Sequence, residues 1–278
     1  MAAKSSFSKN VASFYDRHLS ASTTLGPYFR KCVDFQILPS LRGRDIRVLE
    51  LGCGNGNLAT YLARERSFHV TGVDLSPKSI ALARENAKLQ DVGVTFIASD
   101  ILDEHLDLPR FDVIVGHFVL HEFLGADFDR LAAFLAAHVE ENGYCSFLEN
   151  NSFNPVFRWI RAALPRSARV SHENEYPFDP ARYAVLGLHF KSVRRDCPAV
   201  NLADRFYRQF WPRGVRLEAI HSAALTFDHA MTLALPASIR PWVSYFQIVS
   251  FAQQTVGQRL NPGAVRSPWW RYRAADNL

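Results

Sequence analysis

Five side chains that could bind a cofactor or exchange a proton lie at or near the ends of apolar segments of this sequence. Glu50 directly precedes a glycine-rich stretch, and Asp74 and Asp100 each follow a later apolar run. His117 and His121 follow the next apolar run. A carboxylate accepts hydrogen bonds from hydroxyl and amino groups, and histidine exchanges its proton near neutral pH. These residue types predict a cofactor site beside a site for proton transfer.

The glycine-rich stretch has the order of a strand, a tight turn and a helix. The apolar run Ile46–Leu51 leads into glycines at alternate positions, and an amphipathic segment follows them. These glycines are Gly52, Gly54 and Gly56. Glycine tolerates positive φ and leaves no side chain between the loop and a ligand. We therefore expect a nucleoside-bearing cofactor to lie against this turn.

Two cofactor classes compete for such a turn. The dinucleotide pattern is G-x-G-x-x-G, but here the third glycine comes one position early and Asn57 occupies the expected place. Glu50 would lie close to a bound pyrophosphate and would repel it, whereas it would attract an ammonium or sulfonium group. The turn therefore favours a cationic cofactor over NAD, although Asp74 would suit the ribose of either.

The elements that position these residues alternate between strands and helices. Near-continuous apolar runs separated by helical patterns are typical of a parallel sheet covered on both faces. The expected strands are residues 46–51, 68–73, 94–98, 111–115, 144–148, 190–196 and 244–253. Ser76 and Pro77 form a helix start, and Asp179 and Pro180 repeat the signature. The helix ending near His138 is expected to be closed by Gly143.

The sequence divides into a small N-terminal part and a large domain. Residues 1–43 are expected to form an N-terminal helical cap, and residues 44–278 the main domain. An insertion at about 198–243 separates the last two expected strands and is a candidate lid. All five tryptophans lie after residue 150, where they could cover a substrate or fill the gap between the insertion and the sheet.

Composition narrows the class of protein. The chain has 278 residues, 48% hydrophobic composition and a formal charge of +5, which is too diffuse to predict a nucleic-acid partner. Its four cysteines lack metal-site spacing. No signal peptide and no apolar run long enough to span a membrane is evident, so a cytoplasmic location is expected. The basic, tryptophan-containing tail leaves peripheral contact with a membrane surface open.

Residues 50–56, Glu-Leu-Gly-Cys-Gly-Asn-Gly, resemble the first motif of class I S-adenosylmethionine-dependent methyltransferases. The similarity continues, in the order of the family, through residues 72–76, 98–102 and 111–115. It implies an α/β, Rossmann-like, seven-stranded sheet of order 3-2-1-4-5-7-6. It also implies S-adenosylmethionine as the cofactor.

The resemblance assigns cofactor contacts to several residues. Asp74 would accept hydrogen bonds from the ribose hydroxyls, and Leu75 and Ile101 would enclose the adenine. Asp100 would accept from the adenine amine, unless it caps the turn that follows it. The backbone at Gly116 and His117 would lie beside the methionine moiety. Tyr15 would cover the cofactor, although a core position in an N-terminal helix suits it nearly as well.

His121 is the candidate catalytic base. Methyl transfer to oxygen or nitrogen usually requires removal of a proton, and His121 lies at the rim where the strands end. A packed histidine without a catalytic role is the alternative. His117 and His121 have metal-ligand spacing, but no third ligand is evident, so no metal is expected. Glu149, at the end of the fifth strand, could bind substrate or satisfy loop backbone, and 172–175 offers lid contacts.

A small molecule is the expected substrate. Residues 116–119, Gly-His-Phe-Val, lack the Asn/Asp-Pro-Pro-Tyr pattern of amino-methylating nucleic-acid enzymes, and no added arm for a protein substrate is visible. We expect a lipophilic or secondary-metabolite acceptor. Alternatives are a non-methylating cyclisation, rearrangement or decarboxylation on the same fold, a non-catalytic binding protein, and an NAD-linked oxidoreductase. The sequence leaves the acceptor atom and the oligomeric state open.

Overall fold

A computed structural model gives the fold of the chain. It describes residues 25–38, 41, 45–151, 153–155, 158–159, 178, 180–197, 200–210, 218–236 and 238–253. The expected N-terminal helices before residue 25, with Tyr15, and the candidate lid residues 172–175 lie outside the described residues. The division at residues 43 and 44 therefore stays a prediction.

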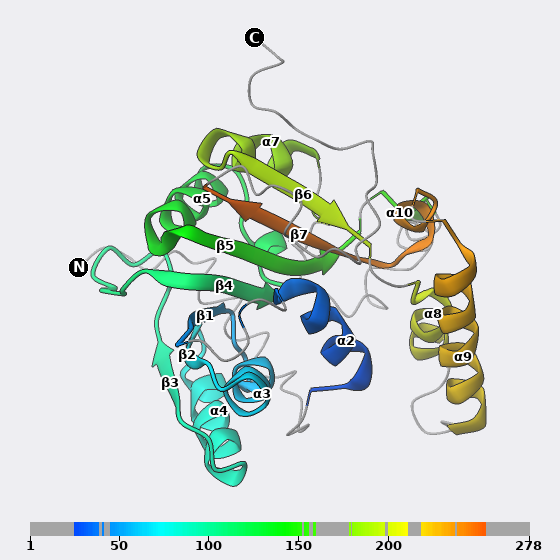
Figure 1. Cartoon of the computed structure of the whole chain (residues 1–278), viewed down its shortest axis with the longest axis horizontal. Coiled ribbons are helices and arrows are strands. Elements are labelled where there is room, and N and C mark those ends of the chain that lie inside the picture. Colours follow the sequence, from blue (N-terminus) through cyan, green and yellow to red (C-terminus); the bar gives the residue numbers. More distant parts are fainter. Residues whose placement is uncertain are drawn as a thin grey trace.

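A seven-stranded sheet crosses the molecule in the order β3-β2-β1-β4-β5-β7-β6, as expected (Figure 1). Its strands are β1 (Arg47–Leu51), β2 (His69–Asp74), β3 (Val94–Ala98), β4 (Phe111–His117), β5 (Val139–Asn150), β6 (Ser192–Asp196) and β7 (Phe246–Ala252). The first five strands pair in parallel, while β7 runs antiparallel to β5 and β6. The carboxyl ends of β1 to β5 therefore share one edge, and the site is expected there.

Helices cover both faces of the sheet. They are α2 (Pro27–Gln36), α3 (Asn57–Arg66), α4 (Pro77–Leu89), η2 (Leu120–Glu122), α5 (Ala126–His138), α7 (Pro180–His189), α8 (Leu202–Phe210), α9 (Glu218–Ala234) and α10 (Arg240–Val243). One core joins the sheet to α5 and α7, with Leu131 and Leu186 fully buried. A second core lies on the other face, beneath α2, α3 and α4, and contains Val33 and Leu62.

The expected helix starts are confirmed where they are described. Ser76 caps α4, because its hydroxyl accepts a hydrogen bond from the Ser79 N–H at 3.0 Å. Pro180 opens α7. The expected C-cap at Gly143 is wrong, because α5 already ends at His138 and β5 begins at Val139.

Gly143 instead lies within β5. A Cβ there would lie 2.7 Å from the Asp112 carbonyl oxygen, so the glycine permits close approach to the start of β4. A glycine is thus required at this position by a close backbone contact within β5, which is longer than expected, and not by the end of a helix.

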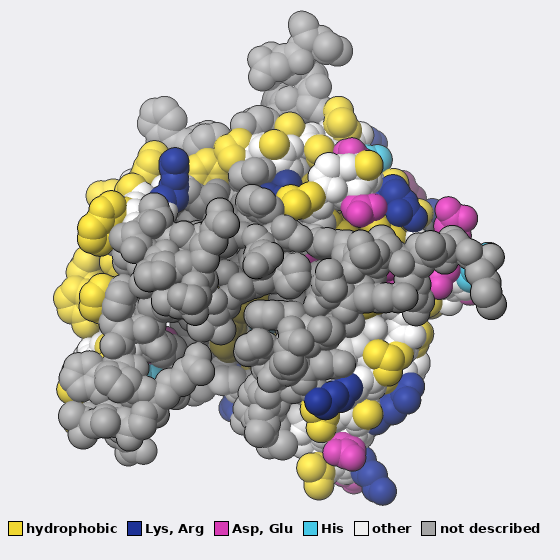
Figure 2. Space-filling model, turned by 180° about the vertical axis from the view of Figure 1, so that it is seen from behind, with side chains coloured by type: hydrophobic (Ala, Val, Ile, Leu, Met, Phe, Trp, Pro, Cys, Tyr) yellow, Lys and Arg dark blue, Asp and Glu magenta, His cyan; other side chains and the backbone are white. Residues whose placement is uncertain are grey.

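The insertion between β6 and β7 is helical. It holds α8, α9 and α10, and α8 packs against α9 to one side of the sheet (Figure 1). Several of its large apolar side chains are exposed, among them Leu225, Phe227, Leu233 and Trp242. Apolar side chains also gather along that side of the molecule when it is seen from behind (Figure 2). Exposed apolar surface of this kind is typical of contact regions.

None of the described helices is both long and apolar enough to cross a membrane.

Candidate functional site

The glycine turn between β1 and α3 is the centre of the site. Gly52, Gly54 and Gly56 have φ values of +64°, +50° and +74°, so each lies in the left-handed region. Gly56 is the N-cap residue of α3, and a Cβ on it would lie 2.7 Å from Cζ of Phe96. The turn can therefore approach both the neighbouring strands and a ligand without an intervening side chain.

Asp74 ties the end of β2 to this turn. One carboxylate oxygen accepts a hydrogen bond from the Gly54 N–H at 2.8 Å, and the other accepts from the Ser76 N–H at 2.9 Å. A carboxylate offers about four acceptor positions, so accepting these two bonds is compatible with a further contact to a hydroxyl group of a ligand. Asp74 thus shapes the turn and remains suited to the predicted ribose contact.

Glu50 is a buried carboxylate directly beside the turn. It lies in β1 between Gly72 of β2 and Val115 of β4, and its side chain is 3% exposed. Its Oε2 has no hydrogen-bond partner among the described residues. Burial raises the pKa of Glu50 well above its usual value, and the Asp74 charge adds to this, while a hydrogen bond from the Ala59 backbone opposes it. Such an oxygen fits a cationic group from a cofactor.

The residues predicted to hold adenine lie on neighbouring strand ends. Leu75 follows β2, and Asp100 and Ile101 follow β3, whose Ala98 pairs with Asp74. The Asp100 carboxylate accepts a hydrogen bond from the Leu102 N–H at 3.0 Å, so it does stabilise the local turn, as the alternative interpretation held. Ile101 is buried, at 6% exposure, in the core that contains Val73.

His117 is held as a neutral ring at the end of β4. Its Nε2 lies 2.7 Å from Oε1 of Gln36, and the Gln36 amide nitrogen donates to the Ser146 carbonyl at 2.9 Å. The amide orientation therefore makes the Gln36 oxygen the acceptor and His117 Nε2 the donor. Burial lowers the pKa of His117 to about 3, so this ring is a poor base near neutral pH.

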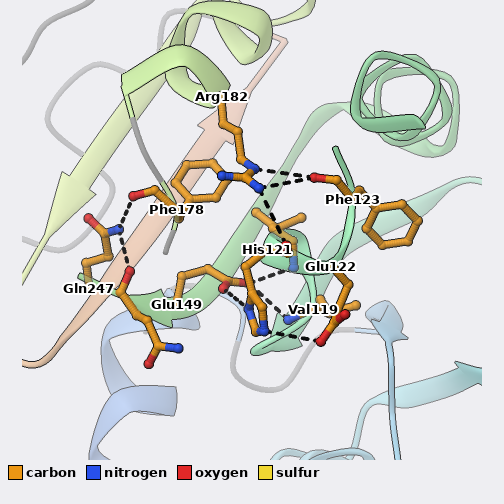
Figure 3. A network of polar contacts seen from close by, with 10 residues as sticks. Val119, His121, Glu122, Phe123, Glu149, Phe178, Arg182 and Gln247 are labelled. Carbon is orange, nitrogen blue, oxygen red and sulfur yellow. Dashed lines mark hydrogen bonds and ion pairs between the residues drawn. The ribbon is translucent and has the colours of Figure 1, made fainter. Parts of the chain in front are cut away.

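His121 lies between two carboxylates (Figure 3). Its Nδ1 is 2.7 Å from Oε2 of Glu149, and its Nε2 is 3.3 Å from Oε1 of Glu122. The side chain is only 2% exposed. To accept a proton from a substrate, Nε2 would have to exchange its contact with Glu122 for one with that substrate.

Glu149 has the second of its two predicted roles, because it satisfies loop backbone. Its Oε1 accepts hydrogen bonds from the Val119 N–H at 3.0 Å and the Leu120 N–H at 2.7 Å, while Oε2 contacts His121. An acidic residue at the end of a buried strand was the sequence signal for a polar contact. The partners of Glu149 could not be inferred from the sequence, because they follow β4 and come close to Glu149 only where β4 and β5 pair in the sheet.

Two further polar residues of this region were not anticipated. Arg182 of α7 donates to the Phe123 carbonyl at 3.3 Å and lies over the ring of Phe178 (Figure 3). Gln247 of β7 donates to the carbonyls of Asn150 and Phe178 at 3.0 and 3.2 Å (Figure 3). The hydrogen-bond partners of the two residues lie 59 to 97 positions away in sequence, and neither residue belongs to a recognisable motif.

Aromatic rings gather where α2, β4 and β7 meet at the same edge. Phe118 lies 4.9 Å from Phe246 and 6.0 Å from Phe29, measured between ring centroids. His117 completes this aromatic group, 5.8 Å from Phe29. Rings at these separations attract one another and present apolar faces. The group joins residues that are more than 200 positions apart in sequence.

The comparisons with known proteins agree with this geometry. Residues 48–143 match the family model described as a methyltransferase domain. The chain is 36% identical over 188 residues to the ubiquinone biosynthesis O-methyltransferase of Coxiella burnetii, covering 62% of this chain and 77% of that relative. It spans only 34%, 24% and 26% of three other methyltransferases that it matches, including protein arginine N-methyltransferase 1 of Saccharomyces cerevisiae.

Two solved structures share the fold at low sequence identity. The N-methyltransferase NodS from Bradyrhizobium japonicum, in complex with S-adenosyl-L-homocysteine, superposes with a TM-score of 0.54 and 14% identity, covering 87% of this chain and 97% of that one. The [4+2]-cyclase SpnF gives 0.52 and 15%, covering 80% and 79%. The glycine turn, the strand order and the relative covered over most of its length lead to one assignment: the chain belongs to the class I methyltransferases that use S-adenosylmethionine.

Proposed function

We propose that the protein transfers the methyl group of S-adenosylmethionine to a small, apolar acceptor molecule. The observation that carries the cofactor part is Glu50, whose buried Oε2 has no hydrogen-bond partner among the described residues and lies beside the glycine turn. A buried carboxylate without a cation is costly, so a ligand that brings a positive charge would offset the cost.

The residues of the glycine turn and the neighbouring strand ends would hold this cofactor. Gly52, Gly54 and Gly56 would leave room for it, and Asp74 would accept from its ribose hydroxyls. Leu75, Asp100 and Ile101 would surround the adenine, and the backbone at His117 would lie near the methionine moiety. When bound, the cofactor supplies an electrophilic methyl group on a sulfonium, and the protein must align an acceptor with it and exclude water.

The aromatic group supports an apolar acceptor. Phe29, Phe118 and Phe246 place ring faces at the carboxyl edge of the sheet, next to the end of β4. The relative from Coxiella burnetii, of which the chain covers 77%, carries the name of an O-methyltransferase, which supports a hydroxyl group as the methylated site. We propose the exposed apolar side chains of the α8–α9 insertion as the lid that closes over such a molecule.

His121 stays a prediction as the base. Its contacts with Glu149 and Glu122 support a role in holding the loop more directly than a role in accepting a proton. A hydroxyl acceptor with a low pKa would need only modest help from a base, since it would be partly ionised in solution.

The test uses S-adenosylmethionine labelled in its methyl group and a panel of small phenols and apolar alcohols. We expect label to enter an organic-soluble product, with one S-adenosylhomocysteine formed for each methylated molecule. Label found only in acid-precipitated protein would contradict a small-molecule substrate. Conversion of an acceptor without S-adenosylhomocysteine would contradict methyl transfer and indicate a non-methylating reaction on this fold.

A further inference from the structure

A buried carboxylate, that of Glu149, holds the first part of the segment that joins β4 to α5. We propose that Glu149 is a positioning residue that locks this segment, Phe118–Phe123, against the glycine turn and so sets the affinity for the cofactor. This inference rests on the proposed function, because it deepens the account of the same site.

Glu149 uses both of its oxygens on this segment. Oε1 accepts from two successive backbone N–H groups, those of Val119 and Leu120, and Oε2 contacts the ring of His121 (Figure 3). Hydrogen bonds to an ionised carboxylate are stronger than those between neutral groups. The side chain is fully buried at the end of β5, so solvent does not compete for these contacts. Three consecutive residues are thereby fixed to one rigid strand.

The backbone at the start of the segment is strained. Phe118 has a φ of +58°, a conformation that a bulky side chain rarely adopts. Its N–H donates to the Leu148 carbonyl at 2.8 Å, and the next two N–H groups are the ones that Glu149 accepts. Strain of this kind persists only where the surroundings over-determine the conformation. Glu149 and the end of β5 supply that constraint.

Val119 connects the constrained segment to the cofactor turn. A Cβ added to Gly52 would lie 2.8 Å from Val119 Cγ2, and one added to Gly116 would lie 2.8 Å from Val119 Cγ1. The isopropyl group therefore fills the space between the glycine turn and the end of β4. Fixing the Val119 backbone also fixes this isopropyl group, which we call the Val119 wedge, and the wedge in turn fixes the position of Gly52.

The far end of the segment has a separate anchor. Arg182 donates to the Phe123 carbonyl and lies within 3.5 Å of the His121 carbonyl (Figure 3). A guanidinium at one end and a carboxylate at the other thus fix the segment from two different elements, α7 and β5. The Glu149 end is the one that reaches the cofactor turn, so we assign the control of affinity to Glu149.

The experiment measures the dissociation constant of S-adenosylhomocysteine by calorimetry, together with the melting temperature. Glu149→Met keeps the length of the side chain and removes all its acceptors, and we expect it to raise the dissociation constant about tenfold. Glu149→Gln should restore part of the affinity, since its amide oxygen can still accept from Val119 and Leu120. Val119→Ala removes the wedge alone and should weaken binding about fivefold.

The double variant shows whether the two residues act in one chain of contacts. If they do, Glu149→Met with Val119→Ala should bind no more than about twofold more weakly than Glu149→Met alone. Tyr183→Phe is the matched control, because it removes one buried hydrogen bond, to Gln247, in the neighbouring α7. It should lower the melting temperature and leave the dissociation constant within about twofold.

The outcomes separate this inference from the proposed function. If the natural protein binds S-adenosylhomocysteine but Glu149→Met binds it equally well, or if the two effects multiply in the double variant, the positioning role is overturned. If Glu149→Met does not fold, Val119→Ala decides alone. The positioning role is overturned if Val119→Ala binds S-adenosylhomocysteine as tightly as the natural protein does. If the natural protein binds no S-adenosylhomocysteine, the proposed function fails as well.

Discussion

At the scale of single residues, two buried glutamates of the site differ in the hydrogen-bond partners of their carboxyl oxygens. The oxygens of Glu149 are engaged by two backbone N–H groups and a histidine ring. Glu50 has an oxygen without a partner among the described residues, and burial raises its pKa. Glu149 therefore belongs to the scaffold, whereas Glu50 is the residue whose environment is completed by a cationic ligand.

Glu50→Gln tests that distinction. Removing the buried charge should weaken S-adenosylmethionine binding about tenfold. The same change should raise the melting temperature of the ligand-free protein by about 2–4 °C, since it removes a desolvation cost of roughly 1 kcal/mol. Calorimetry measures the change in affinity, and a thermal melt measures the change in melting temperature. Unchanged affinity would contradict the charge argument.

The raised pKa of Glu50 also fixes the direction of two pH dependences. In the free protein, a carboxyl whose folded-state pKa is raised contributes stability below its unfolded pKa, and this contribution is lost as pH rises through the folded-state value. A cationic ligand favours the ionised form of Glu50, so cofactor affinity should fall as pH falls through the pKa that Glu50 has in the ligand-free protein. Calorimetric titrations at pH values around this pKa should show that the affinity for the cofactor depends more steeply on pH in the natural protein than in Glu50→Gln.

The glycines of the turn are not equivalent, and alanine substitutions should separate them. A Cβ on Gly54 meets nothing within 4 Å, so Gly54→Ala carries mainly the cost of positive φ, on the order of 1 kcal/mol. A Cβ on Gly56 would lie 2.7 Å from Phe96 and 2.9 Å from Ala83, so Gly56→Ala should be destabilising by roughly 2 kcal/mol more. Chemical denaturation measures both, and equal losses would refute this ranking.

At the scale of elements, helices α8 and α9 depend on a cap that comes from outside α8. The Asp228 carboxylate, in α9, accepts from the Ala203 and Asp204 N–H groups at 2.9 and 2.8 Å. These are among the first N–H groups of α8, which have no partner within their own helix. The pairing of the two helices therefore rests in part on one side chain.

Asp228→Ala should loosen this helix pair. We expect a loss of about 1 kcal/mol, as for other lost N-caps, with faster hydrogen exchange at Ala203 and Asp204. Thr226→Ala is the control in the same helix, because Thr226 is exposed and its hydroxyl donates to the Ser222 carbonyl, one turn earlier. Its effect should stay below about 0.5 kcal/mol. Unchanged exchange at Ala203 in Asp228→Ala would rule out the cap.

At the scale of the whole molecule, the sequence predicted the sheet because apolar runs and turn residues are local signals. The glycine turn, with Asp74 beside it, follows from contiguous motifs, and the family resemblance that these motifs carry implied the strand order. The roles of Gln36, Arg182 and Glu149 do not, because their partners come from strands and helices distant in sequence. Gly143 was misassigned for the same reason, since its constraint comes from Asp112 across the sheet.

The central claim is that the glycine turn binds S-adenosylmethionine. Calorimetric titration of the full chain with S-adenosylmethionine and, separately, with NADH tests it most directly. The account predicts saturable binding of S-adenosylmethionine with one site per chain, and no binding of NADH at the same concentrations. Saturable binding of NADH without any binding of S-adenosylmethionine would contradict it.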